Sequence, residues 1–140
     1  DISLEKFEKN AYKLNSLLKK RARHVISENE RVLKATKALE NSDFAEFGRL
    51  MIASHKSLQN DFEVSSKALD IMVECALEQD ACYGARMTGA GFGGCAVALV
   101  KPEQLEEFSK AVSSCYQKQT NNVASIYITK ASDGTNTVLL

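Results

Sequence analysis

The chain has 140 residues, of which 44% are hydrophobic and 26% are charged. This size and composition are typical of one globular domain with a single hydrophobic core, and they exclude disordered and fibrous chains. Eighteen basic residues balance eighteen acidic ones, so no net charge would draw the domain to nucleic acid or to an anionic membrane. No apolar run approaches a membrane span and the N-terminus does not resemble a signal peptide, so we expect a cytoplasmic protein.

The apolar pattern predicts mostly helix in the first half of the chain. Apolar residues recur at helical spacing through the first forty residues, which predicts one long helix or two consecutive helices. Asp43 with Glu46 three residues later forms a capping box, so another helix is expected to begin there and to end near Leu58. Ser65 and Ser66 are candidate N-caps of a fourth helical segment, whose apolar face comprises Leu69, Met72, Val73, Ala76 and Leu77.

The second half adds strands. Residues 85–88 and the apolar run 95–100 predict a β-hairpin joined by a glycine-rich loop. Pro102 is expected to open a further helix, and residues 123–129 and 135–140 read as β-branched strands around the turn Asp133-Gly134. The predicted order is four helices, two strands, one helix and two strands. This order indicates a single α+β domain over residues 1–140.

Four cysteines and two histidines are the candidate metal ligands and disulfide partners. No C-x-x-C pair occurs, and His24 and His55 stand far apart, so the spacing of a zinc site is absent. We therefore predict no metal site, and we expect reduced cysteines that behave as small apolar residues. The cysteines are Cys75, Cys82, Cys95 and Cys115.

The glycine-rich loop is the candidate functional segment, because five of the seven glycines lie between Gly84 and Gly94. Gly89, Gly91 and Gly94 match the dinucleotide pattern G-x-G-x-x-G, but a strand follows where that fingerprint needs a helix. A P-loop is excluded because Cys95 stands at the position of its lysine. A loop of small residues can instead present backbone N–H groups to an anion or to another backbone. A structural hairpin that binds no ligand remains the alternative.

Residues 84–100 read G-A-R-M-T-G-A-G-F-G-G-C-A-V-A-L-V. This segment resembles the third signature motif of the superfamily that contains galactokinase, homoserine kinase and mevalonate kinase (GHMP kinases). Its particular residues are typical of galactokinases. Three further stretches agree with this resemblance: R-A-R-H-V-I-S-E-N-E-R at residues 21–31, S-H-K-S-L at 54–58 and D-F-E-V-S at 61–65. Ser66-Lys67 departs from the family, in which a Cys-Pro pair is common, and the last forty residues match only in pattern.

The resemblance implies the C-terminal domain of an enzyme that transfers the γ-phosphate of ATP, with Mg²⁺, to the anomeric hydroxyl of galactose. It implies helices packed on a four-stranded antiparallel sheet of ferredoxin-like character. Catalytic residues and metal ligands would then belong to an N-terminal domain that this chain lacks, so the fragment alone is expected to be inactive. The implied site near the phosphates and the sugar is the loop Gly89, Ala90, Gly91, Phe92, Gly93 and Gly94, supported by Thr88.

Three alternatives stay open within and outside this resemblance. The chain could derive from a kinase of N-acetylgalactosamine or from a galactose sensor that keeps the fold without turnover. From a different class, it could be a stand-alone ferredoxin-like binding module. The sequence upstream of Asp1 would discriminate these alternatives, because the sugar pocket of the family lies there.

Other polar residues have simpler explanations. Asp61 and Glu63 precede a helix, where acids usually cap or are solvated, so we do not predict magnesium ligation. His24 and His55 are expected to be partly buried, hydrogen-bonded histidines rather than catalytic bases. The basic run 19–23 is expected to be a solvated helix face. Strand alternation should place Thr88 and Arg86 on one face of the sheet, opposite Met87 and Ala85.

Overall fold

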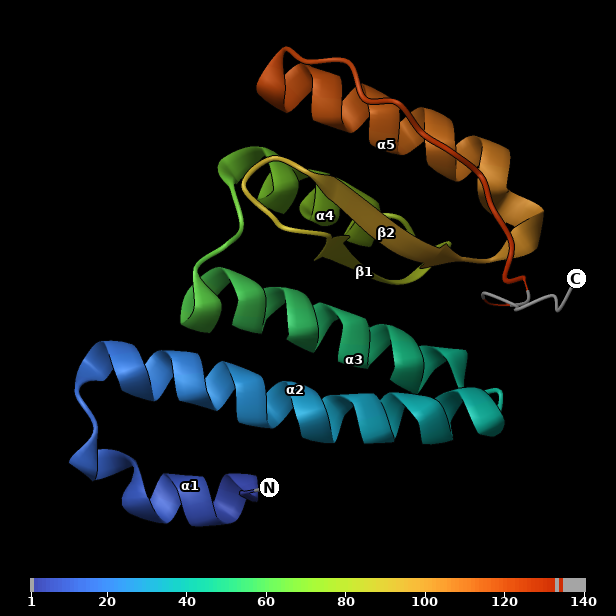
Figure 1. Cartoon of the computed structure of the whole chain (residues 1–140). Helices are drawn as coiled ribbons and strands as arrows, with labels where there is room; N and C mark the ends of the chain where they lie inside the picture. Colours follow the sequence, from blue (N-terminus) through green and yellow to red (C-terminus); the bar gives the residue numbers. More distant parts are fainter. Residues whose placement is uncertain (1, 133, 135–140) are drawn as a thin grey trace, which may run out of the picture.

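The computed structural model describes residues 2–132 and 134. Its elements form stacked layers that run from α1 and α2 through α3 to a small sheet with α4 and α5 (Figure 1). The two alternatives predicted for the first forty residues resolve as two helices, separated by the turn η1. In chain order the elements are α1 (Leu4–Asn10), η1 (Ala11–Lys13), α2 (Ser16–Glu40), α3 (Phe44–Ser57), η2 (Leu58–Phe62), α4 (Lys67–Leu77), β1 (Cys82–Thr88), β2 (Cys95–Val100), η3 (Pro102–Gln104) and α5 (Leu105–Thr120).

Side-chain caps explain where the first four α-helices begin. Each is preceded by a residue whose side-chain oxygen accepts a hydrogen bond from a backbone N–H of the first turn, which satisfies a donor that has no partner inside the helix. The predicted caps at Asp43 and Ser66 are confirmed. Pro102 opens η3, which leads directly into α5. The four caps are Ser3, Asn15, Asp43 and Ser66.

The sheet consists of β1 and β2, paired antiparallel with Ala85 opposite Ala98 and Met87 opposite Ala96. Ala85 of β1 packs with residues of α4 and α5 in the main core, and Ala96 and Ala98 of β2 pack against this cluster. The buried core residues of this cluster are Ile71, Val73, Cys75, Ala76, Ala81, Ala85, Phe108 and Val112. Helix α3 also packs closely against β1.

Glycines allow α3 and β1 to touch backbone to backbone. Gly48 of α3 and Gly84 of β1 are both buried. A Cβ on Gly48 would overlap the carbonyl of Tyr83, and a Cβ on Gly84 would overlap the backbone of Gly48. Only glycine fits at either position, and the short separation brings the rest of α3 into hydrogen-bonding range of β1.

The prediction of four strands is wrong for the described part of the chain, which contains only two. Residues 123–129 form no strand and instead run alongside α5 (Figure 1). Several of their side chains stay exposed, including Val123 and Tyr127. β-branched residues favour a strand only when a neighbouring edge pairs with them, and no such pairing is present here. The predicted strand 135–140 and Asp133 of its turn lie outside the described residues.

The expectation of reduced cysteines is also wrong, because Cys75 and Cys115 form a disulfide that joins α4 to α5. The two residues are 40 positions apart, with Cα atoms 5.8 Å from each other. No local spacing reveals such a pair, because only the packing of α4 on α5 brings the two sulfur atoms together. Cys82 and Cys95 are free thiols.

A buried polar cluster joins α2 to α3 and η2. Nδ1 of His24 lies 3.0 Å from Oγ of Ser57, and that hydroxyl donates to a carboxylate oxygen of Asp61 at 3.0 Å. Since the Ser57 proton is directed at Asp61, Nδ1 of His24 is the donor to Ser57. Phe62 stacks on the imidazole, with ring centroids 4.6 Å apart. His24 is therefore a buried, hydrogen-bonded histidine, as predicted.

Helix α2 also carries an apolar stripe that the described residues leave uncovered. Leu18, Val25, Val32 and Leu39 are each about half exposed. Their spacing of seven residues places them along one side of the helix. Within residues 2–132 and 134, no helix has both the length and the apolar character to cross a bilayer.

We predict that reduction of the Cys75–Cys115 disulfide destabilises the protein. Opening a crosslink between residues 40 apart lets the unfolded chain gain entropy, which corresponds to about 4 kcal/mol at most. Urea unfolding with and without a dithiol reductant measures the difference. A variant with Cys82→Ser and Cys95→Ser should respond to reductant as the wild type does, whereas Cys115→Ser should not respond. Equal midpoints for the oxidised and reduced wild type would contradict the disulfide.

We also predict a loss of stability in mild acid to which His24 contributes. Burial lowers the pKa of His24 below its ordinary value of 6.5, and Arg31 adds to this effect, while Asp61 opposes it. The unfolded chain therefore binds a proton more readily than the folded chain, so stability is full above about pH 6.5 and falls as the pH drops below it. The thermal midpoint, followed from about pH 7.5 to about pH 5, should fall less in His24→Asn than in the wild type. Parallel curves for the two proteins would rule out a contribution from His24.

Candidate functional site

The glycine-rich loop, residues 89–94, connects β1 to β2 in a backbone conformation that favours glycine. The φ angles are positive at Gly89 (77°), Gly91 (85°), Phe92 (57°) and Gly93 (122°). L residues with a Cβ rarely adopt such angles, so the glycines are required for the conformation.

The outer side of the loop is open. Nothing lies within 4 Å of the position that a Cβ would take on Gly89 or Gly93. Phe92 is 73% exposed, and Thr88 at the end of β1 is also exposed. This side of the loop can therefore be approached closely by a phosphate or by another backbone.

The inner side of the loop rests on Val64. The backbone N–H of Phe92 donates to the carbonyl of Val64 at 2.9 Å, and a Cβ on Gly91 would overlap the same carbonyl. Val64 is itself held, because its N–H donates to the carbonyl of Leu58 at 3.1 Å. The loop is thus supported by the segment that follows η2.

Basic residues of α2 hold that segment in place. Glu63, in a left-handed conformation at the end of η2, pairs with Lys20 at 2.9 Å and Arg21 at 2.7 Å. The hydrogen bonds from Lys20 and then Arg21 lower the pKa of Glu63. Arg21 also donates to the carbonyl of Asp61. The basic run 19–23, expected to be solvated, is therefore partly engaged in ion pairs.

His55 of α3 supports the other base of the loop, at the end of β1. The backbone N–H of Met87 donates to Nδ1 of His55 at 3.2 Å. Nε2 of His55 lies 3.4 Å from a carboxylate oxygen of Asp70. Burial lowers the pKa of His55, while Asp70 opposes this effect. The expectation of a buried, hydrogen-bonded histidine is confirmed.

The strand residues before the loop alternate as predicted. Ala85 and Met87 are buried, Arg86 is half-buried and Thr88 is exposed. Nε of Arg86 donates to the carbonyl of Met87 at 3.0 Å, and burial lowers the pKa of Arg86. Arg86 therefore reinforces the strand just before the loop.

No metal centre accompanies the loop. Residues 2–132 and 134 contain no group of three or more His, Cys, Asp or Glu side chains placed to hold a metal ion. Asp61 and Glu63, considered above as magnesium ligands, are engaged with Ser57, Arg21 and Lys20.

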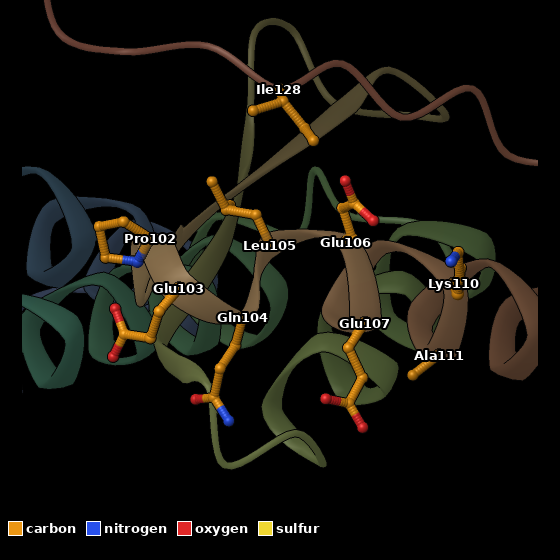
Figure 2. A pocket seen from close by; sticks show the side chains of 9 residues that line it. All are labelled: Pro102, Glu103, Gln104, Leu105, Glu106, Glu107, Lys110, Ala111 and Ile128. Carbon is orange, nitrogen blue, oxygen red and sulfur yellow. The ribbon is translucent and has the colours of Figure 1, made fainter.

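A concavity lies away from the loop, around η3 and the start of α5, with Ile128 above it (Figure 2). Leu105 and Glu106 point toward Ile128, while Glu103, Gln104 and Glu107 point the other way (Figure 2). Acids in the first turn stabilise a helix through its dipole, which accounts for Glu106 and Glu107. This concavity holds no convergent polar groups, so we place the candidate site at the loop.

Sequence reasoning identified the loop but missed its supports, Val64 and the pair His55 and Asp70. A signal was present, since residues 54–58 and 61–65 were among the stretches typical of galactokinases. The structure brings these two stretches, the stretch 21–31 and the loop into one connected region.

Known proteins with similar sequences are galactokinases. The chain is 46% identical over 135 residues to a galactokinase of Levilactobacillus brevis, which covers 96% of this chain and 35% of that relative. It is 52% identical over 115 residues to a galactokinase of Streptococcus thermophilus, which covers 82% of this chain and 30% of that relative. The chain thus spans about a third of the length of these relatives.

Solved structures and a family model agree with the sequence matches. The structure of Lactococcus lactis galactokinase complexed with galactose matches with a TM-score of 0.87 and 44% identity, over 90% of this chain and 33% of that chain. The L. major mevalonate kinase in complex with R-mevalonate matches with a TM-score of 0.56 and 26% identity, over 81% of this chain and 35% of that chain. The model described as GHMP kinases C terminal matches residues 35–118, more than half of the chain. The family model and the galactokinase matches therefore identify this α+β chain, with its helices packed on an antiparallel hairpin, as a member of the GHMP kinase C-terminal family.

Proposed function

We propose that this chain is the C-terminal third of a galactokinase and that its loop 89–94 helps to enclose the reacting phosphate of ATP. The observation that carries the proposal is the loop, which is open at Gly89 and Gly93, held from beneath at Val64, and part of a chain 46% identical to a galactokinase. The sugar would be galactose, since the similar structure from Lactococcus lactis is complexed with it.

Backbone groups are suited to this task. The transferred phosphoryl group carries negative charge on its oxygens, and preorganised N–H donors stabilise such charge without a covalent step. A loop of small residues lets the partner backbone and the phosphates approach closely. Because the loop is supported at Val64 and Met87, its backbone N–H donors would not have to reorganise during the reaction.

ATP and Mg²⁺ would be held mostly by the remaining two-thirds of the enzyme. When bound, ATP supplies the phosphoryl group and Mg²⁺ neutralises charge that develops on it. The residues of this chain fit a supporting role toward the phosphates, because the loop offers backbone atoms and no carboxylate cluster. We propose that the catalytic groups and the metal ligands belong to the N-terminal domain.

The same N-terminal domain is the proposed partner of this chain in a cytoplasmic enzyme. The chain covers only 35% of the Levilactobacillus brevis relative, so the larger part of such an enzyme lies outside it. The apolar stripe of α2 at Leu18, Val25, Val32 and Leu39 offers a surface for such a partner, since exposed apolar patches usually mark interfaces.

The proposal is tested by an assay for ADP formation with galactose and Mg-ATP. The 140-residue chain alone should show no turnover. A chimera, in which this chain replaces the matching C-terminal third of the Levilactobacillus brevis galactokinase, should turn over on the order of 1 to 1,000 times per second. An inactive chimera that is folded and binds ATP, or an active isolated chain, would contradict the proposal.

In the chimera, Gly93→Val should reduce catalysis more than stability. A β-branched residue at the φ of 122° strains the backbone by about 1 to 3 kcal/mol, yet its Cβ would meet no atom within 4 Å. A shift of about 1 Å beside the phosphate lowers the rate on the order of a hundredfold. The measurements are kcat, the KM values for ATP and galactose, and the thermal midpoint.

Gly91→Val is the matched comparison, because its side chain would overlap the carbonyl of Val64. We expect Gly91→Val to lose stability and activity together. If Gly93→Val keeps full activity, or loses it only in proportion to the unfolded fraction, the loop is a structural hairpin and its role near the phosphate is wrong.

A further inference from the structure

The two supports of the glycine-rich loop meet at one pair of side chains. The first support is the end of β1, where the N–H of Met87 donates to Nδ1 of His55 at 3.2 Å. The second is the segment 64–65, where the carbonyl of Val64 accepts from Phe92 and the hydroxyl of Ser65 donates to Asp70. His55 and Asp70 lie within 3.4 Å of each other.

We propose that His55 and Asp70 act as a positioning pair that sets the loop 89–94 by holding both of its supports at once. The consequence for catalysis rests on the galactokinase function proposed above, whereas the consequence for loop structure does not. Neither residue touches the loop, so both act through Met87 and Val64.

The hydrogen bonds of His55 determine which ring nitrogen carries the proton when His55 and Asp70 hold the loop supports. Because Nδ1 of His55 accepts the Met87 N–H, the ring proton must sit on Nε2, which faces the carboxylate of Asp70. A carboxylate on one imidazole nitrogen orients the ring and selects this tautomer. Asp70 accepts from Ser65 with the same carboxylate, so one side chain couples the two supports.

The geometry connects this pair to the loop through short contacts. Met87 is 1% exposed, and its Cε lies 3.0 Å from the position of a Cβ on Gly91. On its other side Gly91 is closed by Val64, while the outer side of the loop is open at Gly89 and Gly93. Gly91 is thus enclosed between Met87 and Val64, so a movement of either residue would reach the loop at this position.

Burial favours the neutral form of His55. Burial lowers its pKa, Arg86 of β1 adds to this effect, and Asp70 and Glu74 of α4 oppose it. Protonation would place a second N–H opposite the Met87 N–H and break that contact. The neutral ring is therefore the state in which the end of β1 is held.

The first experiment measures hydrogen exchange at the amides of Met87 and Phe92 in the 140-residue chain. In His55→Gln the side-chain amide takes the place of Nε2, so the acceptor for the Met87 N–H is lost. The amides of Met87 and Phe92 should then exchange on the order of tenfold faster, after correction for global stability. In His55→Asn the side-chain oxygen takes the place of Nδ1, so the protection of Met87 should be retained. Asp70→Asn should speed exchange at both amides.

His24→Gln is the control for the Met87 contact, because His24 is similarly buried and hydrogen-bonded but contacts Ser57 and Phe62 instead of Met87. It should lower global stability and leave the relative protection of Met87 unchanged. If His24→Gln affects the Met87 amide as His55→Gln does, or if His55→Gln and Asp70→Asn leave the amides of Met87 and Phe92 unchanged, the positioning role is overturned.

The second experiment measures kinetics in the chimera with the Levilactobacillus brevis relative. His55→Gln should lower kcat on the order of a hundredfold with a smaller change in the KM for galactose, and His55→Asn should recover most of that loss. Equal kcat values for wild type and His55→Gln would overturn the catalytic part of the inference. A wild-type chimera that is folded, binds ATP and is inactive would refute the galactokinase function, whereas altered exchange at Met87 and Phe92 would still support the positioning role.

Discussion

The contact between α3 and β1 is the constraint on which the rest of the structure depends. Gly48 and Gly84 remove every side chain from this contact, so the two backbones touch. This close approach places His55, about two turns further along α3, in range of the Met87 N–H. Helix and strand are then joined by packing at one end and by a hydrogen bond at the other. The orientation of β1, and with it the start of the loop, follows from these two contacts.

The two sides of the glycine-rich loop have different physical requirements. Gly91 must lack a side chain because Val64 occupies that space, whereas Gly93 must lack one only because of its backbone angle. A single glycine-rich motif therefore combines a structural position with an open one. The proposed role beside a transferred phosphoryl group would require this combination, since backbone donors must then be both fixed and accessible.

The α4–α5 side of the sheet is held by apolar packing and by a disulfide, and the α2–α3 side by buried polar groups. Cys75 lies within the core cluster and links it to Cys115 of α5. His24, Ser57 and Asp61 instead connect α2, α3 and η2 by directional hydrogen bonds. Directional bonds position their neighbours more precisely than apolar contacts do, and the segment that supports the loop lies on this polar side.

The amino-acid sequence by itself determined the helices, the hairpin and the location of the loop, because apolar periodicity, caps such as Asp43 and glycine spacing act over a few residues. Three features were decided only by the tertiary structure: the pairing of Cys75 with Cys115, the extended path of residues 123–129 outside the sheet, and the meeting of His55 with Asp70 beneath the loop. Each depends on which elements pack together, since a sulfur atom, a strand edge or a carboxylate finds its partner only across the folded chain. Local pattern carries no information about such distant partners.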